Sequence, residues 1–139
     1  LYSGQEGGNR KRIRFFDKDT VEVTDTTLAS FYRRMIALKH ASPALANGAA
    51  GGAQATLALE GAPASAYAFT RARGRDAVLV AVNMGSAAQS LRYDALAMPG
   101  RWRDWFTGAP VTLGRRGTLD VPAHGFRVLV QGRAAPPRH

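Results

Sequence analysis

The residues that could form a polar site at the start of this chain follow directly on an apolar strand end at residues 1–2. Glycines at positions 4, 7 and 8 tolerate positive φ angles and predict a tight loop, in which Gln5 and Glu6 supply an amide and a carboxylate. Such loops often carry binding groups, because the strand before them is rigid. We therefore take Gln5 and Glu6 as candidate binding residues. Since so little of the strand is present, we expect the chain to be the tail of a longer protein.

Histidine and serine residues give weaker signals for chemistry. His40 and His124 lie far apart in the sequence, and a metal site or a catalytic triad would need a third ligand or a serine nucleophile beside them. Ser3-Gly4 lacks the nucleophile-elbow pattern of serine hydrolases. We expect neither role for these histidines, and no metal site.

The composition limits the class of protein. Of 139 residues, 45% are hydrophobic, which is enough for the core of one domain, and there is no cysteine for a disulfide. No run of about 18 apolar residues predicts a membrane helix, so we expect no membrane partner. The formal net charge is +9, but the only dense basic cluster is at residues 10–14. We therefore expect a solvated basic surface rather than specific nucleic-acid binding.

One long helix would follow the first loop. Apolar residues recur at i, i+3, i+4, i+7 and i+8 and predict a helix over residues 26–40. This apolar face, the helix stripe, consists of Leu28, Phe31, Tyr32, Met35 and Ile36. The candidate N-caps are Thr24, Asp25 and Thr26.

Beyond an Ala/Gly-rich connection, the apolar period changes to two, which predicts strands. The expected strands are residues 54–59, 65–71, 76–83, 89–93, 101–106, 118–121 and 126–131, with a weaker one at 111–113. Short strands at this spacing predict an antiparallel sandwich or barrel. The adjacent aromatic residues Phe15 and Phe16 predict a further extended piece, anchored in a core.

Taken in order, these motifs resemble the C-terminal end of an α-amylase-type glycoside hydrolase of family 13. Residues 1–6 are similar to the motif at the end of the eighth barrel strand of that family. The other segments that carry the resemblance are residues 12–19, 31–39, 42–45, 80–83, 105–108 and 123–129.

The resemblance implies a mainly β fold: a Greek-key antiparallel β-sandwich of the type called domain C, preceded by one long α-helix from the end of a (β/α)8 barrel. Residues 1–45 would be the last barrel strand end, loop and helix. Residues 46–133 would be the sandwich, and residues 134–139 a disordered tail.

The resemblance further implies that the full-length parent hydrolyses α-1,4-glucosidic bonds of starch-like glucans. Retaining hydrolysis needs two carboxyl groups about 5–5.5 Å apart, which the family carries on barrel strands that this chain lacks. The acids near the first loop share no rigid scaffold; they are Glu6, Asp17, Asp19 and Asp25. We therefore expect no catalytic residue here and no activity from the chain alone. Its partner would be the missing barrel, which domain C shields and stabilises.

The same resemblance places Gln5 and Glu6 at the rim of the parent's active site, although we favour a purely structural role for Glu6. It implies no cofactor in this chain. Calcium, which many relatives bind through barrel and inserted-domain residues, would be held in the full-length parent. An extracellular or periplasmic location is favoured by the resemblance, whereas the sequence itself leaves the compartment open.

Trp102 and Trp105 lie three apart in an expected strand, so their side chains should point to opposite faces. We favour burial of both, one in the sandwich and one at a domain interface. An exposed indole could instead stack on a sugar ring, and Trp105 is then the candidate substrate-binding residue.

Two other functions stay open. The chain could be a non-catalytic starch- or carbohydrate-binding β-sandwich module that uses Trp105. It could also self-associate through the helix stripe, because that face needs a partner surface.

Overall fold

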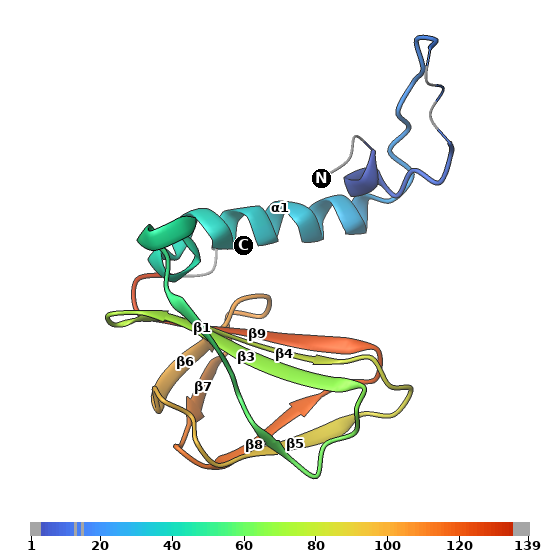
Figure 1. The fold of residues 1–139 in the computed structure, drawn as a ribbon. Coiled ribbons are helices and arrows are strands. Elements are labelled where there is room, and N and C mark those ends of the chain that lie inside the picture. Colours follow the sequence, from blue (N-terminus) through green and yellow to red (C-terminus); the bar gives the residue numbers. More distant parts are fainter. Residues whose placement is uncertain (1–3, 13, 15, 135–139) are drawn as a thin grey trace. The chain divides into compact units, whose positions relative to one another are not determined.

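The computed structural model describes residues 4–12, 14 and 16–134 (Figure 1). It divides into two compact units, Leu1–Ala37 and Leu38–His139. The division falls within the long helix α1 (Thr26–Ala41), earlier than the boundary after residue 45 that the sequence suggested. The physical reason is that Leu38 is 1% exposed, and that the short helix η2 (Pro43–Leu45) packs on two strands of the second unit.

The first unit contains a short 3-10 helix, η1 (Gln5–Gly7), and most of α1. Asp25 caps α1: its Oδ1 accepts a hydrogen bond from the Leu28 amide at 2.9 Å, and its carbonyl accepts one from the Ala29 amide. On the helix stripe, Ile36 is 45% exposed and the other four side chains are half-buried. The predicted helix and one of its three predicted caps are thus confirmed.

The second unit contains η2, a further short helix η3 (Gly48–Ala50), and the strands. The strands among the described residues are β1 (Ala53–Thr56), β2 (Leu59–Glu60), β3 (Ala66–Arg73), β4 (Asp76–Asn83), β5 (Gln89–Tyr93), β6 (Gly100–Asp104), β7 (Pro110–Leu113), β8 (Gly117–Val121) and β9 (Gly125–Gln131).

These strands form an antiparallel sandwich of two sheets (Figure 1). The large sheet has the strand order β1-β3-β4-β9-β6-β7, and the small sheet has the order β2-β5-β8. Side chains from both sheets meet in one core; among them are Leu79, Trp102 and Leu129 from the large sheet, and Leu91 and Leu119 from the small one. The predicted mainly β fold with one long helix is confirmed, and the described strands close no barrel.

Two local expectations were wrong. The strand expected at residues 54–59 divides into β1 and β2, because Leu57 turns into the core and the chain then passes from the large sheet to the small one. Phe16 is 94% exposed and anchors no core, and its neighbour Phe15 lies outside the described residues.

A buried amide holds one end of the sandwich together. Asn83, at the end of β4, is 1% exposed. Its Nδ2 donates to the carbonyls of Ala87 at 2.8 Å and Pro122 at 3.0 Å, while its Oδ1 accepts from the Gly85 amide at 3.0 Å. One side chain thus joins β4 to the loops before β5 and after β8, and it satisfies backbone groups that burial would otherwise leave unpaired.

The Asn83→Ala substitution is expected to lower the free energy of unfolding by about 2–3 kcal/mol, because it leaves three backbone groups without their partner. Urea unfolding of the whole chain, followed by tryptophan fluorescence, measures this loss. Ser86→Ala, at an exposed position in the same loop, is the control and should change the value by less than about 0.5 kcal/mol. Equal effects of the two substitutions would contradict the role of Asn83.

Candidate functional site

The loop over residues 4–9 is held by hydrogen bonds to the segment that enters α1. The Gly7 carbonyl accepts hydrogen bonds from the amides of Thr24 at 2.7 Å and Asp25 at 2.9 Å, and also from the Thr24 hydroxyl at 3.1 Å. Within the loop, Gly4 accepts from the amides of Gly7 and Asn9. The Gly7 carbonyl thus ties residues 4–9 to the N-terminus of α1.

Two glycines of this loop are required by close packing. Gly4 has φ of 92°, and a Cβ atom there would lie 2.6 Å from Val21 Cγ1. A Cβ on Gly7 would lie 3.0 Å from the Val23 backbone. The glycines therefore allow the 21–25 segment to approach the loop, and this packing accounts for them without a ligand.

The structure places both candidate rim residues on the surface. Gln5 and Glu6 are adjacent in η1, and both side chains are exposed. Glu6 lies in the first turn of this short helix, where a carboxylate suits the helix dipole. The exposure of Gln5 and Glu6 does not test a contact with substrate, so the location of these residues at an active-site rim stays a prediction.

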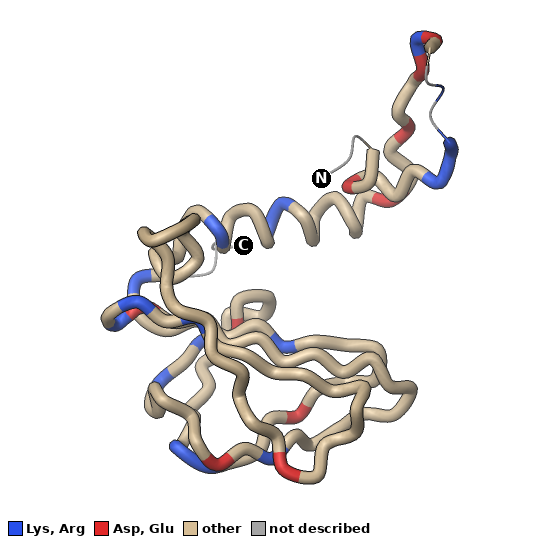
Figure 2. The backbone as a smooth tube through the Cα atoms, viewed as in Figure 1, with Lys and Arg blue, Asp and Glu red and all other residues tan. Residues whose placement is uncertain are grey.

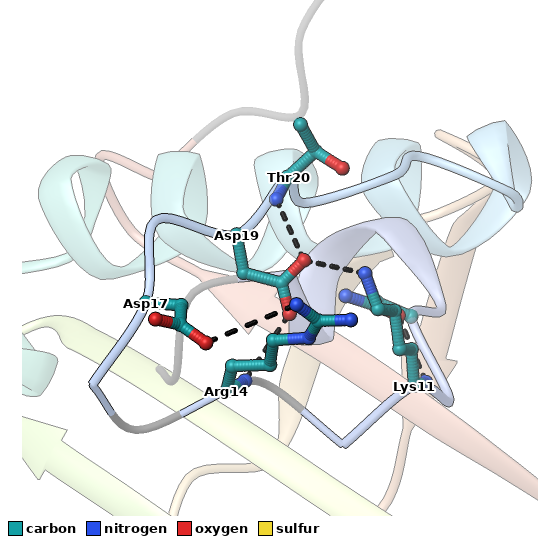
Figure 3. Close-up of polar contacts among 6 residues, drawn as sticks. Lys11, Arg14, Asp17, Asp19 and Thr20 are labelled. Carbon is teal, nitrogen blue, oxygen red and sulfur yellow. Dashed lines mark hydrogen bonds and ion pairs between the residues drawn. The ribbon is translucent and has the colours of Figure 1, made fainter.

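A network of charged residues shapes the loop between η1 and α1 (Figure 3). The Asp19 carboxylate accepts hydrogen bonds from Lys11 Nζ, from the Arg14 amide at 3.1 Å and from the Thr20 amide at 2.9 Å. The hydrogen bond from Lys11 is the main cause that lowers the pKa of Asp19, and it also raises the pKa of Lys11. Asp17 forms a longer ion pair with Arg14, at 3.8 Å.

The acids that the sequence singled out for chemistry mostly have structural partners. Asp25 caps α1, Asp19 organises the loop and Asp17 pairs with Arg14. In the described part of the chain, no group of three or more His, Cys, Asp or Glu residues is arranged to hold a metal ion.

Both tryptophans are buried, as we favoured. Trp102 is 3% exposed, and its Nε1 donates to the Met98 carbonyl at 3.1 Å. Trp105 is 1% exposed, and its amide donates to the Val128 carbonyl at 2.8 Å. The alternative assignment of Trp105 as a sugar-stacking residue is corrected, because its ring has no exposed face. The expected strand was also too long: β6 ends at Asp104, so strand alternation does not orient Trp105.

The large sheet has a second apolar face, turned away from the core. Residues in register across β3, β4 and β9 form three rows on this outer face: Tyr67, Val82 and Phe126; Phe69, Val80 and Val128; Arg71, Val78 and Val130. The last row is covered, since Val78 and Val130 are each 1% exposed and Arg71 donates to the Gly52 carbonyl. The first row is open, with Tyr67 42% and Phe126 39% exposed. Apolar alternation in the sequence predicts these strands, but it does not show that their apolar faces lie side by side.

The charged residues lie mainly outside the apolar rows on the outer face of the large sheet. Figure 2 shows basic and acidic residues gathered in the loop between η1 and α1 and around the ends of the sandwich strands. Among the described residues, no helix has the length and apolar character needed to cross a membrane.

The fold is similar to that of several α-amylases. The structure of AmyP in complex with maltose matches with a TM-score of 0.63 and 16% sequence identity, over 86% of this chain and 23% of AmyP. The α-amylase of Geobacillus thermoleovorans complexed with acarbose matches with a TM-score of 0.63 and 16% identity, over 78% of this chain and 23% of its own. The Anoxybacillus α-amylase matches with a TM-score of 0.62 and 19% identity, over 84% and 24%.

No family model matches the chain, and no curated protein matches it by sequence. At identities of 16–19%, the similarity to α-amylases concerns the fold, and the chain spans only 23–24% of the length of these enzymes. Within those bounds the resemblance seen in the sequence is confirmed: the chain has the fold of an amylase-type C-terminal region.

Protonation of Asp19 is expected to loosen the charged loop. Its folded-state pKa lies below the ordinary value of 3.8, so the carboxylate stabilises the loop fully above that value, and this contribution is lost as the pH falls through the folded pKa. An NMR titration that follows the Arg14 and Thr20 amides should therefore give a midpoint below 3.8. In the Lys11→Met variant the main cause is removed, and the midpoint should rise toward 3.8. If the titration midpoint were the same in the Lys11→Met variant as in the wild-type chain, the proposed role of Lys11 in lowering the pKa of Asp19 would be contradicted.

Proposed function

We propose that this chain is the non-catalytic C-terminal part of an α-amylase-like glycoside hydrolase, whose full-length form hydrolyses the α-1,4-glucosidic bonds of starch-like glucans. In this proposal the sandwich is domain C, and it covers and stabilises a (β/α)8 catalytic barrel encoded outside the chain. The similarity in fold supports the class of protein. The observation that carries the docking role is the apolar outer face of the large sheet.

The outer face has the chemistry of a surface that is buried in a larger protein. The half-exposed rings of Tyr67 and Phe126 flank Val82 in one continuous row across three strands. A ring contact extends this row, since the rings of Phe106 and Phe126 meet edge to face with their centroids 5.2 Å apart. Contiguous exposed apolar patches mark interaction sites, because burying them gains about 25 cal/mol per Å² of apolar surface. An apolar surface of a catalytic barrel would supply that burial.

The structural roles of two acids near the first loop support the absence of catalytic carboxylates in that loop. A general acid must protonate the leaving group and a nucleophile must reach the sugar, so neither can be committed to holding its own loop. Asp19 and Asp25 are each bound to backbone amides of their own segment. In this proposal the catalytic pair therefore lies on the barrel.

The exposed pair Gln5 and Glu6 fits the rim of the parent's active site, where α-glucan would pass. Its support is that the Gly7 carbonyl anchors the loop while leaving both side chains in solvent. We place any calcium of the full-length parent outside this chain. An extracellular or periplasmic location for the parent follows from the sequence resemblance alone.

The first prediction from this proposal is that the purified 139-residue chain has no glucan-hydrolysing activity. A labelled maltooligosaccharide incubated with the chain should give no more product than the buffer does. Sustained turnover that co-purifies with the folded chain would overturn the non-catalytic assignment.

A second prediction concerns docking in the full-length polypeptide, whose coding sequence upstream should contain barrel motifs. Phe126→Glu would place a carboxylate at the buried interface, so heat should inactivate the full-length hydrolase roughly tenfold faster. Ala88→Glu, at an exposed position before β5, is the matched control and should leave the inactivation rate unchanged.

Two results would count against the docking proposal. One is an upstream sequence without barrel motifs, and the other is equal inactivation rates for the two variants. Sedimentation of the isolated chain tests self-association through the helix stripe. That alternative would be supported if the chain forms a dimer that the Ile36→Glu substitution dissociates.

A further inference from the structure

The small sheet carries a recess of about 390 Å³ near the ends of its strands, within the size range of ligand pockets. The register explains which side chains surround it. Glu60 on β2, Arg92 on β5 and Thr118 on β8 lie in one cross-strand row. Asp94 and Arg116 follow directly from the ends of β5 and β8.

The charged side chains of this recess have unused hydrogen-bonding capacity. Glu60 and Arg92 are direct cross-strand neighbours, yet no ion pair joins them. Among the residues that the structure describes, no hydrogen bond or ion pair holds any of the four charged side chains around the recess. Two guanidinium groups and two carboxylates thus offer both donors and acceptors to a ligand.

A buried phenol completes the set. Tyr93 belongs to the core and is 1% exposed, yet it also lines the recess. Its ring reaches across to β8, where a Cβ atom on Gly117 would lie 2.9 Å from Tyr93 Oη. Within the described residues this hydroxyl has no hydrogen-bond partner, and it is not one of the buried polar atoms that are left unsatisfied, so it opens onto the recess, where water or a ligand can pair with it. Burial raises the pKa of Tyr93, so the hydroxyl keeps its proton and can donate it to a ligand.

The balance of charges selects the class of ligand. Glu60 and Asp94 oppose an anion, while Arg92 and Arg116 oppose a cation. A neutral ligand with neighbouring hydroxyl groups meets neither penalty, because each hydroxyl can donate to a carboxylate and accept from a guanidinium or phenol.

We propose that this recess on the small sheet is a binding site for one unit of a neutral saccharide, with Tyr93, Arg92 and Glu60 as the principal contacts. The site lies on the sheet opposite the outer face, so it needs no catalytic barrel. It therefore goes beyond the proposed function, and the failure of either leaves the other standing.

The test is an NMR titration of the full chain with maltotriose, with cellotriose and with inorganic phosphate. Either sugar should shift the amides of Arg92 and Thr118 in a saturable way. Tyr93→Phe keeps the ring but removes the hydroxyl, and should weaken binding roughly three- to tenfold. Thr118→Val, which leaves the core untouched, should weaken it by a similar factor.

Thr112→Val is the matched control, because it removes an exposed strand hydroxyl from the large sheet. It should leave sugar binding unchanged. The proposal is overturned if neither sugar shifts these amides in the wild-type chain, if only phosphate does, or if Tyr93→Phe and Thr118→Val both bind the sugar as the wild-type chain does.

Discussion

The constraint on which this structure depends is that β4 is apolar on both faces. Ala77, Leu79 and Ala81 point into the sandwich core, while Val78, Val80 and Val82 point to the outer face. A strand of this kind must have a layer on each side, because exposed apolar surface costs free energy in water. The small sheet covers one side completely. On the other side, η2 and the Arg71 contacts cover one end of the sheet, and the Tyr67 row stays open. The inner face of β4 is thus covered by the small sheet, whereas part of its outer face is exposed and would gain stability from a further covering layer.

The outer face of the small sheet is polar, whereas the outer face of the large sheet is apolar. The second unit thus has two different kinds of surface. The strands of the small sheet alternate between core residues such as Leu91 and Leu119 and exposed polar residues such as Arg92 and Thr118. Such alternation is typical of an antiparallel sheet with one face in water. Water can satisfy these groups, so the face needs no protein partner, and what it offers is hydrogen bonding to soluble molecules. The two surfaces that we propose for docking and for ligand binding therefore lie on different sheets.

The sequence predicted those features of the structure that depend on neighbouring residues, but not those that depend on contacts between distant residues. The bounds of β4 and β5 were predicted to the residue, because apolar alternation and turn residues are local properties. The helix cap at Asp25 was among three neighbouring candidates for the same reason. Trp105 was misplaced because it lies one residue past the end of β6, where alternation no longer governs direction. The recess was not predicted at all, since Glu60, Arg92 and Thr118 are distant in sequence and only strand register brings them together.

Glycine illustrates why composition alone could not distinguish the two candidate sites. The glycines of the first loop suggested a ligand site, but the space beside Gly4 and Gly7 is filled by the apolar residues Val21 and Val23, so packing alone requires them. Gly117 is the first residue of β8, and nothing in its sequence context indicated a ligand site. The space beside it is filled by the hydroxyl of Tyr93, a polar group without a partner among the described residues. Packing explains why Gly117 has no side chain, and the hydroxyl beside it opens onto the recess, where water or a ligand can pair with it. The hydroxyl at the recess, rather than the glycine-rich loop, is therefore the group with hydrogen-bonding capacity available to a ligand.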